Sequence, residues 1–431
     1  MRTLAEWLAL QESVHPKTID MGLGRVTTVA RSLGIDKPAC PVITVGGTNG
    51  KGSTVAHLEA LLESAGRRTG MFTSPHFIRY NERIRVGGLE VEDAELIAAF
   101  ETIEQARGST TLTFFEYNTL AALLIFRRRA VEVAILEVGL GGRLDATNLV
   151  DADVAIVCSI GFDHRDWLGD TLEQIGAEKA GIFRAGRPAV LSTPQMPHSV
   201  LARIGEIGAR AVVAEHDFSW SLADPGRAGS RWSYRGLRLS LQDLPPSALG
   251  GSIQYRNAAA ALAAIESLPA AARAEGALRL TDRTVSEGLA RVRLAGRFQV
   301  VPGEVEWILD IAHNEPAARM FAQHVRERPQ GEGARTLAVV GILGDKDAPA
   351  IVRELEPLVS HWVLCSLPGP RGVTAAALAQ RVQLPRERAT LADSVEEACE
   401  RARAAARPGD RILVFGSVHT VGPALQWLRI Y

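Results

Sequence analysis

A glycine-rich stretch carries the clearest chemical signal in the sequence. Val42–Val45 read VITV, a β-branched run typical of a strand, and GGTNGKGST follows directly. Glycines let backbone N–H groups close around an anion, and the N-terminus of a following helix attracts it. Lys51 would neutralise phosphate oxygens, and Ser53 or Thr54 offers a hydroxyl to a phosphate or Mg²⁺. We predict an ATP-binding loop, shortened from the usual G-x-x-x-x-G-K-[ST] pattern; the alternative is a tight turn with an exposed lysine.

Polar side chains follow several of the predicted strands. In an open α/β sheet, ligands bind outside the carboxyl ends of the strands, so we expect these side chains near the phosphate loop. Ser74 in TSPH, Glu137 in EVGLGG, and Asp163 with His164 in GFDH occupy such positions. They suit Mg²⁺ when phosphate oxygens dominate its shell. Taken singly, Ser74 also fits a helix N-cap before Pro75, and His164 fits a buried structural histidine.

The elements that must position these residues alternate between short apolar runs and longer helical patterns. This alternation predicts βαβ units, a parallel sheet and an α/β fold, with a helix at Val55–Ala65 after the loop. The stretch from about Phe218 to Leu249 differs, because RWSYRGLRLSL alternates like exposed strands. The other strands are expected at Pro41–Val45, Thr69–Thr73, Glu132–Val138, Asp153–Ser159, Pro188–Ser192, Trp307–Ile311, Thr336–Gly341, Trp362–Leu367 and Arg411–Gly416.

Length and composition limit the class of protein. A chain of 431 residues predicts two domains, here 1–294 and 295–431, with a boundary near Leu294–Gly296. Lys plus Arg (48) nearly balance Asp plus Glu (49), so we expect no nucleic-acid or membrane partner. Four scattered cysteines, no signal peptide and no long apolar run predict a cytoplasmic protein.

Taken together, the motifs resemble the folylpolyglutamate synthase/dihydrofolate synthase family of the Mur-ligase superfamily. The resemblance runs from KTIDMGLGRV to FGSVHTVG and includes GTNGKGS, TSPH, RYNERIRV, EVGLGGRLDATN, AEKAGIF, GRF and LDIAHN. It implies an ATP-dependent amide ligase whose active site lies between its two domains. The first would be a P-loop ATPase domain of the Mur-ligase central type with the pterin/folate site. The second would be a smaller, Rossmann-like ligase domain.

The resemblance also implies roles for individual residues. Ser74, Glu137 and His164 match residues that hold two Mg²⁺ ions in the family, and Lys179 matches a carbamylated lysine that serves the metal site. K⁺ is a further candidate ion. Lys51, His164 and Lys179 would be catalytic. The segment EQIGAEKAGIFRAG predicts Lys179 at the start of a helix or turn that leads into Pro188–Ser192. A surface salt bridge from Lys179 to Glu173 or Glu178 is the alternative. The nucleotide would be held by Thr48, Asn49, Gly50, Lys51, Gly52, Ser53, Asn257, Arg297 and Asp310.

The same resemblance implies an acid substrate with a flat pterin ring. An aromatic face with a few fixed polar groups suits such a ring. We therefore expect glutamate to be joined to 7,8-dihydropteroate and to reduced folates, through an acyl phosphate made from ATP. The partners expected are these small molecules, with a monomeric protein. The pterin site would consist of Thr18, Ile19, Asp20, Met21, Thr113, Phe114, Phe115, Glu116, Leu144, Asp145 and Ala146.

Two positions depart from the pattern of the family, and two other classes of protein fit the sequence less well. Gly24 stands where relatives tend to have an acidic residue, and Pro316 is shifted by one position, which affects local geometry only. A peptidoglycan-building Mur ligase would need about a hundred residues more before the loop, but only 45 residues precede Gly46. A GTPase-like switch would carry an N-K-x-D motif and lack AGRF and LDIAHN, whereas this chain has both of the latter. The start of FFEYNTLAALLIF fits either a pterin site or a core helix.

Overall fold

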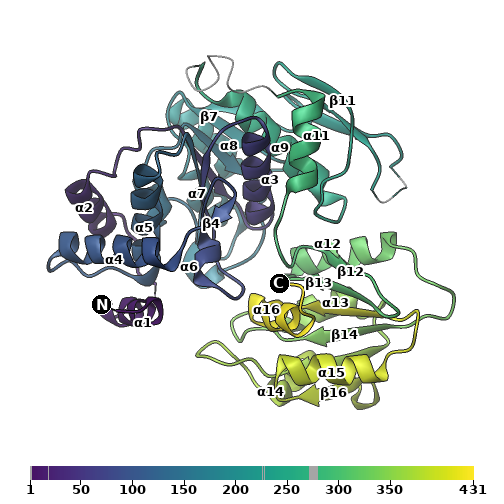
Figure 1. Cartoon of the computed structure of the whole chain (residues 1–431). Helices are drawn as coiled ribbons and strands as arrows, with labels where there is room; N and C mark the ends of the chain where they lie inside the picture. The colour runs from purple at the N-terminus through teal and green to yellow at the C-terminus, as the bar shows by residue number, and fades with distance from the viewer. Residues whose placement is uncertain (1, 18, 226, 228, 271–279) are drawn as a thin grey trace. The chain divides into compact units, whose positions relative to one another are not determined.

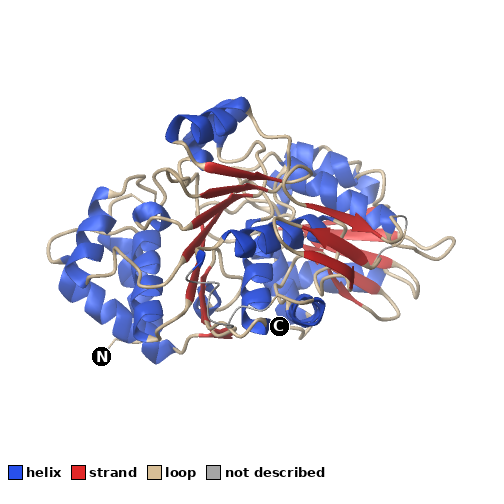
Figure 2. Ribbon diagram, turned by 90° about the horizontal axis from the view of Figure 1, so that it is seen from above, coloured by secondary structure: helices blue, strands red, loops and turns tan. Residues whose placement is uncertain are grey.

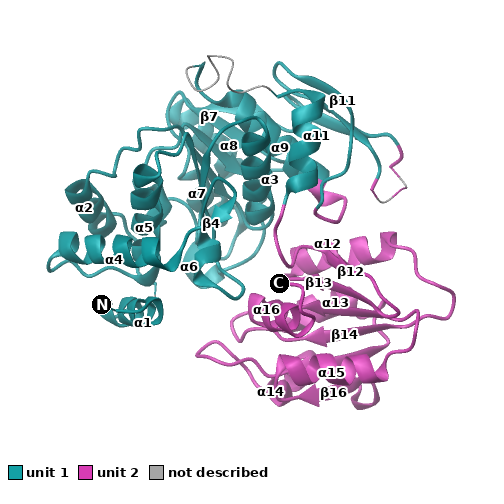
Figure 3. Ribbon diagram, in the orientation of Figure 1, with its two compact units in different colours: residues 1–223, 230–248, 255–292 teal, residues 224–229, 249–254, 293–431 magenta. Residues whose placement is uncertain are grey.

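The computed structural model describes residues 2–17, 19–225, 227, 229–270 and 280–431 (Figure 1). They form two compact units (Figure 3). Unit 1 contains residues 1–223, 230–248 and 255–292, and unit 2 contains residues 224–229, 249–254 and 293–431. Two short segments from the middle of the chain thus join the C-terminal part in unit 2. The separate functions expected for the two domains stay a prediction.

Unit 1 is built on an eight-stranded sheet in the order β4-β3-β2-β5-β1-β6-β7-β8. Six neighbouring strands are parallel, namely β2, β5, β1, β6, β7 and β8. β3 and β4 add an antiparallel edge beside β2. The predicted α/β class is confirmed. The strands are β1 (Val42–Gly46), β2 (Thr69–Phe72), β3 (Ile84–Val86), β4 (Leu89–Glu90), β5 (Val133–Glu137), β6 (Val154–Val157), β7 (Pro188–Leu191) and β8 (Arg210–Val213).

Helices pack against both faces of this sheet (Figure 2). They are α1 (Leu4–Val14), α2 (Gly24–Leu33), α3 (Lys51–Ser64), α4 (Asp93–Arg107), α5 (Phe114–Arg128), α6 (Arg165–Leu168), α7 (Leu172–Ala180), α8 (His198–Ile207), α9 (Ile253–Ser267) and α11 (Asp282–Arg291). Short 3₁₀ turns are η1 (Tyr80–Arg83) and η2 (Ala146–Leu149). None of the helices in the described ranges is long and apolar enough to cross a membrane.

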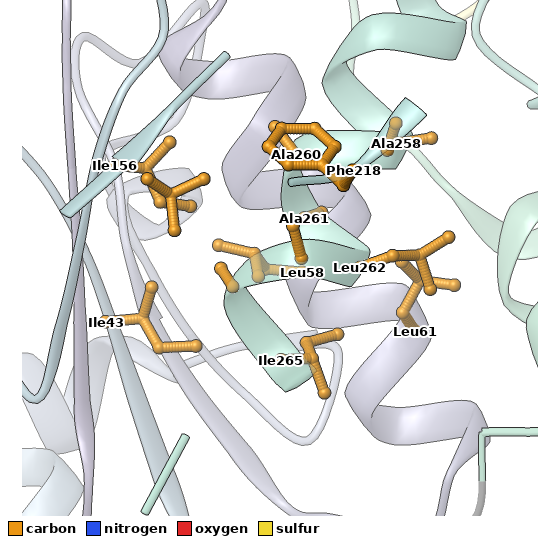
Figure 4. Close-up of a cluster of buried hydrophobic side chains, with 14 of the residues drawn as sticks. Ile43, Leu58, Leu61, Ile156, Phe218, Ala258, Ala260, Ala261, Leu262 and Ile265 are labelled. Atoms are coloured by element: carbon orange, nitrogen blue, oxygen red, sulfur yellow. The ribbon is translucent and has the colours of Figure 1, made fainter. Parts of the chain in front are cut away.

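The alternation of side chains along the strands explains the two cores. Ile43 and Val45 of β1 point to one face, where α3 and α9 cover them, and Val42 points to the opposite face. Figure 4 shows Ile43 and Leu58 of α3 in the first of these cores, beside the alanine-rich part of α9. Alanines let α9 approach closely, and burial of this cluster holds α3, and hence the loop before it, on the sheet.

A small antiparallel sheet, in the order β11-β10-β9, covers the outer side of α9. It consists of β9 (Ser219–Leu222), β10 (Trp232–Arg235) and β11 (Ser240–Leu244). The sequence predicted strands here, and Trp232 and Tyr234 form the buried face of β10. The Glu266 carboxylate accepts a hydrogen bond from the Tyr234 hydroxyl at 2.7 Å and so fixes β10 to α9.

Unit 2 contains a six-stranded sheet in the order β12-β13-β17-β14-β15-β16, parallel except for β12. Every strand range expected from the sequence overlaps an observed strand. The strands are β12 (Gln299–Val301), β13 (Glu306–Asp310), β14 (Thr336–Val340), β15 (His361–Cys365), β16 (Ala389–Ala392) and β17 (Arg411–Phe415). The helices are α12 (Glu315–Glu327), α13 (Ala348–Leu355), α14 (Ala375–Val382), α15 (Val395–Ala405) and α16 (Val418–Trp427), with a 3₁₀ turn η3 (Arg386–Arg388).

Candidate active site

The predicted phosphate-binding loop joins β1 to α3, between Gly46 and Lys51. Gly47 has a φ angle of +133° and Gly50 one of +93°, which other residues rarely adopt. A Cβ atom at Gly47 would also lie 3.0 Å from the backbone nitrogen of Cys158. The turn itself therefore requires these glycines. The first turn of α3 leaves backbone N–H groups available to an anion.

Two lysines converge on this loop. The Nζ atom of Lys51 donates to the carbonyl oxygens of Gly47, at 3.0 Å, and of Thr48, at 3.1 Å. The Nζ atom of Lys179 donates to the same Gly47 oxygen at 3.1 Å. Ammonium groups in such positions can neutralise phosphate oxygens. The lysine of the loop is therefore not a free surface charge, as the alternative of a simple turn would require.

Of the two candidate hydroxyls in the loop, only one remains a candidate. Thr54 is fully buried, and its Oγ1 atom lies 3.4 Å from the sulfur of Cys158. Ser53 is also buried, with a backbone oxygen that pairs with the imidazole of His57 at 2.7 Å. Because Thr54 already has a partner deep in the core, Ser53 is the hydroxyl that could meet a nucleotide.

The loop is fixed to the segment that carries His164. The Thr48 hydroxyl donates to the carbonyl oxygen of Gly161 at 3.1 Å and accepts from the nitrogen of Gly161 at 3.0 Å. The nitrogen of Asn49 donates to the Ser159 hydroxyl at 3.1 Å. Two segments more than a hundred residues apart in the sequence therefore form one unit. His164 stands at the start of α6, with a φ angle of +51°.

Glu137 is the last residue of β5 and pairs in register with Val45 of β1. Its carboxylate accepts hydrogen bonds from the Thr73 hydroxyl and from the backbone nitrogen of Ser74, the latter at 3.3 Å. The ends of β1, β2 and β5 thus meet as the sequence predicted. In the part of the chain that the structure describes, no helix begins directly at the residue that follows Ser74, so the N-cap interpretation is wrong.

Sequence reasoning did not single out two residues near Glu137. Thr73 is one, through its hydrogen bond to the Glu137 carboxylate. Arg83 is the other: burial lowers the pKa of its guanidinium, and the charge of Glu137 is among the groups that oppose this shift. Both lie in or beside the motifs TSPH and RYNERIRV, so their positions carried a signal, but one that only the fold could connect to Glu137.

Lys179 lies near the end of α7, not at the start of a helix, so that prediction was wrong. The helix begins seven residues earlier, where Thr171 and Gln174 form a capping box that the sequence analysis overlooked. Burial lowers the pKa of Lys179 to about 7, and the charge of Lys51 lowers it further. The predicted alternative of a surface salt bridge is also wrong, because the lysine is 5% exposed and bonds to Gly47. Its former candidate partner Glu178 pairs instead with Arg143, at 2.8 Å.

The candidate acceptor segments meet along the glycines that follow β5. A Cβ atom at Gly139 would lie 2.6 Å from the ring of Phe115, and one at Gly141 would lie 3.5 Å from the Cε atom of Met21. A Cβ atom at Gly142 would lie 3.0 Å from the carbonyl oxygen of Lys179. The segments around residues 19–21, 113–116 and 144–146 are therefore gathered beside α7, whose Lys179 reaches the nucleotide loop.

A network of charged groups ties two of these segments together. Arg25 donates to the Asp20 carboxylate at 2.7 Å and lies 3.2 Å from the carboxylate of Glu116. His15 connects Asp20, at 3.1 Å, to the hydroxyl of Thr111, at 2.9 Å. Neither Arg25 nor His15 was predicted from the sequence, although Arg25 is the last residue of the motif KTIDMGLGR and His15 lies two positions before it. Thr18 lies outside the described residues.

The start of α5 differs in burial from the rest of the helix. Thr113 and Glu116 form a capping box at the N-terminus of α5, and every residue from Glu116 to Phe126 is buried. The helix is therefore part of the core, whereas Phe114 and Phe115 at its start are only half-buried. Ile19 is exposed. Leu144 is half-buried and Ala146 is buried.

Two of the predicted acidic residues bond mainly to the protein backbone. Asp145 accepts from the nitrogens of Leu140, at 2.8 Å, and Thr147, at 3.0 Å. Asp310, in unit 2, accepts from the nitrogens of Phe298 and Ala312. Burial raises the pKa of both carboxyl groups, although these hydrogen bonds oppose the shift. Both acids thus shape their loops, in addition to any contact they make with a ligand.

The three residues expected to hold the nucleotide from outside the loop belong to different units. Asn257 of α9 lies in unit 1, where a Cβ atom at Gly50 would be 3.2 Å from its Oδ1 atom. Asn257 therefore stands directly beside the loop. Arg297 lies in unit 2, where its charge opposes the raised pKa of Asp310.

The residues at the sheet edge fit a hard divalent cation. Among the described residues, no group of three or more His, Cys, Asp or Glu side chains could hold a metal ion. The predicted ligand set contains only two such residues, Glu137 and His164, together with a hydroxyl and a lysine. A carboxylate and a hydroxyl, completed by phosphate oxygens, are ligands that Mg²⁺ accepts. Any metal here would depend on the nucleotide for part of its shell.

Comparison with known proteins agrees with this geometry. Residues 45–194 match the Mur ligase middle domain, and residues 296–418 match the Mur ligase glutamate ligase domain. The dihydrofolate synthase/folylpolyglutamate synthase of Escherichia coli K12 is 43% identical, over 98% of this chain and 95% of its own. The relative from Mycobacterium tuberculosis H37Rv is 33% identical, over 95% and 90% of the two chains.

Solved structures agree with the sequence matches. Escherichia coli FolC in complex with DHPP and ADP has a TM-score of 0.91 and 42% identity, covering 99% of this chain and 98% of its own. A bifunctional folylpolyglutamate synthase/dihydrofolate synthase with Mn, AMPPNP and L-glutamate bound has a TM-score of 0.89 and 40% identity, covering 100% and 98%. The fold of this chain, with its predicted phosphate-binding loop at the carboxyl ends of the parallel strands, is that of a Mur-type ligase. Within that class, the chain belongs to the dihydrofolate synthase/folylpolyglutamate synthase family.

Proposed function

We propose that this chain joins L-glutamate to 7,8-dihydropteroate and to the glutamate tail of reduced folates, with ATP as the energy source. One relationship carries this proposal. The three glycines Gly139, Gly141 and Gly142, here called the glycine strip, lie next to Phe115 and Met21. The last of them, Gly142, packs on the backbone of Lys179, whose ammonium reaches Gly47. An acid bound at the strip would thus place its carboxylate beside the nucleotide loop.

The reaction requires activation of a carboxylate. Its oxygen attacks the γ-phosphorus of ATP, the bond to ADP breaks, and an acyl phosphate forms. The amine of glutamate then attacks the acyl carbon, and inorganic phosphate leaves as the amide bond forms. Lys51 is placed to neutralise the transferring phosphoryl group, and Thr48, Asn49, Gly50, Gly52 and Ser53 are proposed to surround the phosphates.

We assign the metal ligands as Ser74, Glu137 and His164, with Lys179 as a carbamate. Mg²⁺ would supply charge neutralisation for the phosphate oxygens. A second Mg²⁺ and a K⁺ ion stay predictions. The position of Lys179 supports the carbamate. The ammonium groups of Lys179 and Lys51 repel each other at one carbonyl oxygen, whereas a carbamate on Lys179 would be an oxygen ligand for the metal. Carbamate formation joins the neutral amine to CO₂ with release of one proton.

The remaining assignments concern ligand contacts. We propose that Asn257, Arg297 and Asp310 contact the nucleotide. The acceptor would lie against Ile19, Asp20, Met21, Phe114 and Phe115, while Thr113, Glu116, Leu144, Asp145 and Ala146 shape the site around it. Thr18 is proposed on the resemblance alone. A cytoplasmic location is supported by the four free cysteines, and a monomeric state stays a prediction.

The test is release of ADP by the purified full-length chain. We expect ADP only when L-glutamate is present with an acceptor acid, and we expect it both with dihydropteroate and with tetrahydrofolate. Products are identified by mass. ADP release that is independent of the acceptor would instead indicate a nucleotide-driven switch. Turnover with tetrahydrofolate but not dihydropteroate would refute the bifunctional part of the proposal.

A further inference from the structure

Two exposed aromatic residues flank His164. Phe162 is 47% exposed and Trp167 is 49% exposed, and they are the only exposed Phe, Trp or Tyr side chains among the described residues of unit 1. Large aromatic side chains usually bury most of their area, so two of them left open within six residues need an explanation. Aromatic surface beside a proposed catalytic group is typical of a ligand-binding wall.

The short helix that carries Trp167 is fixed next to the acceptor segments. Leu168, the following residue, is buried. A Cβ atom at Gly141 would lie 3.0 Å from the Cδ2 atom of Leu168 and 3.5 Å from the Cε atom of Met21. α6 and the segment around Met21 thus meet over the same glycine.

The other aromatic residue is tied to the nucleotide loop. Phe162 directly follows Gly161, which exchanges two hydrogen bonds with Thr48. The guanidinium carbon of Arg165 lies 5.6 Å from the centroid of the Phe162 ring, and Arg165 is paired with Asp170 at 2.8 Å. A cation over one face of the ring reduces its electron density, which favours stacking of an electron-rich arene on the ring.

The two acid substrates of the proposed reaction differ in where their ring lies. In dihydropteroate the carboxylate is bonded directly to the aminobenzoate ring. In a folate, an amide and the glutamate side chain separate that ring from the reacting γ-carboxylate. When the reacting carboxylate stands between Lys51 and His164, only the ring of dihydropteroate lies immediately beside them.

We infer that Phe162 and Trp167 hold the aminobenzoate ring of dihydropteroate and so determine how well this chain uses it relative to folates. This inference rests on the proposed function. The two residues are positioning residues for the carboxylate, since the ring that they hold fixes its direction. The two residues therefore contribute to the use of dihydropteroate, whose carboxylate is attached to the ring, and not to the use of folates.

The experiment compares kcat/KM for dihydropteroate and for tetrahydrofolate in Phe162→Ala, Trp167→Ala and Trp167→Phe. One aromatic contact is worth about 1 kcal/mol, so the ratio of the two kcat/KM values should fall about fivefold in each Ala variant. Trp167→Phe should retain most of the ratio, because a ring remains. Leu201→Ala is the matched control, since Leu201 is equally exposed (46%) but lies on α8.

A second readout is binding. Without nucleotide, dihydropteroate should quench the tryptophan fluorescence of the unsubstituted chain, and a part of this quenching should be lost in Trp167→Phe. A ratio that stays unchanged in both Ala variants would overturn the inference, whether the two activities fall together or not at all. Failure of the unsubstituted chain to use either acid is a different result and would refute the proposed function itself.

Discussion

Lys51 and Lys179 donate to one and the same acceptor, the carbonyl oxygen of Gly47, at 3.0 Å and 3.1 Å. The two lysines come from different helices, α3 and α7, and are separated by more than a hundred residues. Two ammonium groups at one oxygen repel each other, and the buried member of the pair gives up its proton more readily. The arrangement becomes favourable when phosphate oxygens bind Lys51 and when Lys179 is no longer a cation.

The first prediction follows for Lys179. With ¹³C-labelled bicarbonate we expect a carbamate carbon signal in NMR spectra of the unsubstituted chain at about pH 8. The signal should weaken as the pH falls below about 7, where the amine gains its proton. Lys179→Ala should lose both the signal and ligase activity, and Lys37→Ala, an exposed lysine, should lose neither. A full signal in Lys179→Ala, or full activity without the lysine, would contradict the carbamate.

The second prediction concerns Lys51. Lys51→Ala should lower kcat by about a hundredfold to a thousandfold, because a charge that neutralises the transferring phosphoryl group is removed. The thermal unfolding midpoint should change little, since the hydrogen bonds of this lysine to described residues go to carbonyl groups of its own loop. Near-normal turnover in this variant would show that the loop is only a turn.

The third prediction concerns Glu137. Glu137→Gln keeps the size of the side chain but removes its charge, so binding of Mn²⁺ in the presence of a non-hydrolysable ATP analogue should weaken at least tenfold. Electron paramagnetic resonance of free Mn²⁺ measures this directly. Glu12→Gln, on the exposed face of α1, is the control. Equal Mn²⁺ affinity in the two variants would remove Glu137 from the metal site.

The fourth prediction concerns the pH dependence of stability. Burial lowers the pKa of His57 to about 4, and its ring pairs with the backbone of Ser53 and the hydroxyl of Ser247. Between pH 6.5 and 4 the unfolded chain binds a proton that the folded chain does not. Stability should therefore fall over this window by about 3 kcal/mol from this group, and level off below it.

Urea unfolding at a series of pH values measures this effect. His57→Gln should be less stable at pH 7, because buried hydrogen bonds are altered, yet it should show a smaller slope between pH 6.5 and 4. His216, which is exposed, provides the control variant His216→Gln. An unchanged slope in His57→Gln would show that other groups cause the acid sensitivity.

Much of this architecture could be predicted because it depends on local patterns. The β-branched run before Gly46 and the glycines after it specify a strand and a turn, wherever the rest of the chain lies. The topological rule that ligands gather at the carboxyl ends of parallel strands then brought Ser74, Glu137 and His164 to one edge. Periodicity and this rule sufficed for the fold and for the edge at which the proposed site lies.

The rest depends on contacts between segments that are distant in sequence. Nothing near Thr73 in the sequence indicates that it bonds to Glu137, nothing near Arg83 indicates that the charge of Glu137 acts on it, and nothing near Arg25 indicates that it bridges Asp20 and Glu116. The start of the helix that carries Lys179 was predicted too late, because the capping box of Thr171 and Gln174 that begins it was not recognised. Side-chain partners of this kind are fixed by packing, which a pattern along one strand or helix does not contain.

The most direct test of the central claim is the fate of a carboxylate oxygen. Dihydropteroate labelled with ¹⁸O in its carboxylate is incubated with ATP, Mg²⁺, L-glutamate and the full-length chain. If the carboxylate is activated as an acyl phosphate beside Lys51, each dihydrofolate formed is accompanied by one inorganic phosphate that carries ¹⁸O from the acid. Dihydrofolate formed with unlabelled phosphate, or no dihydrofolate at all, would contradict the account.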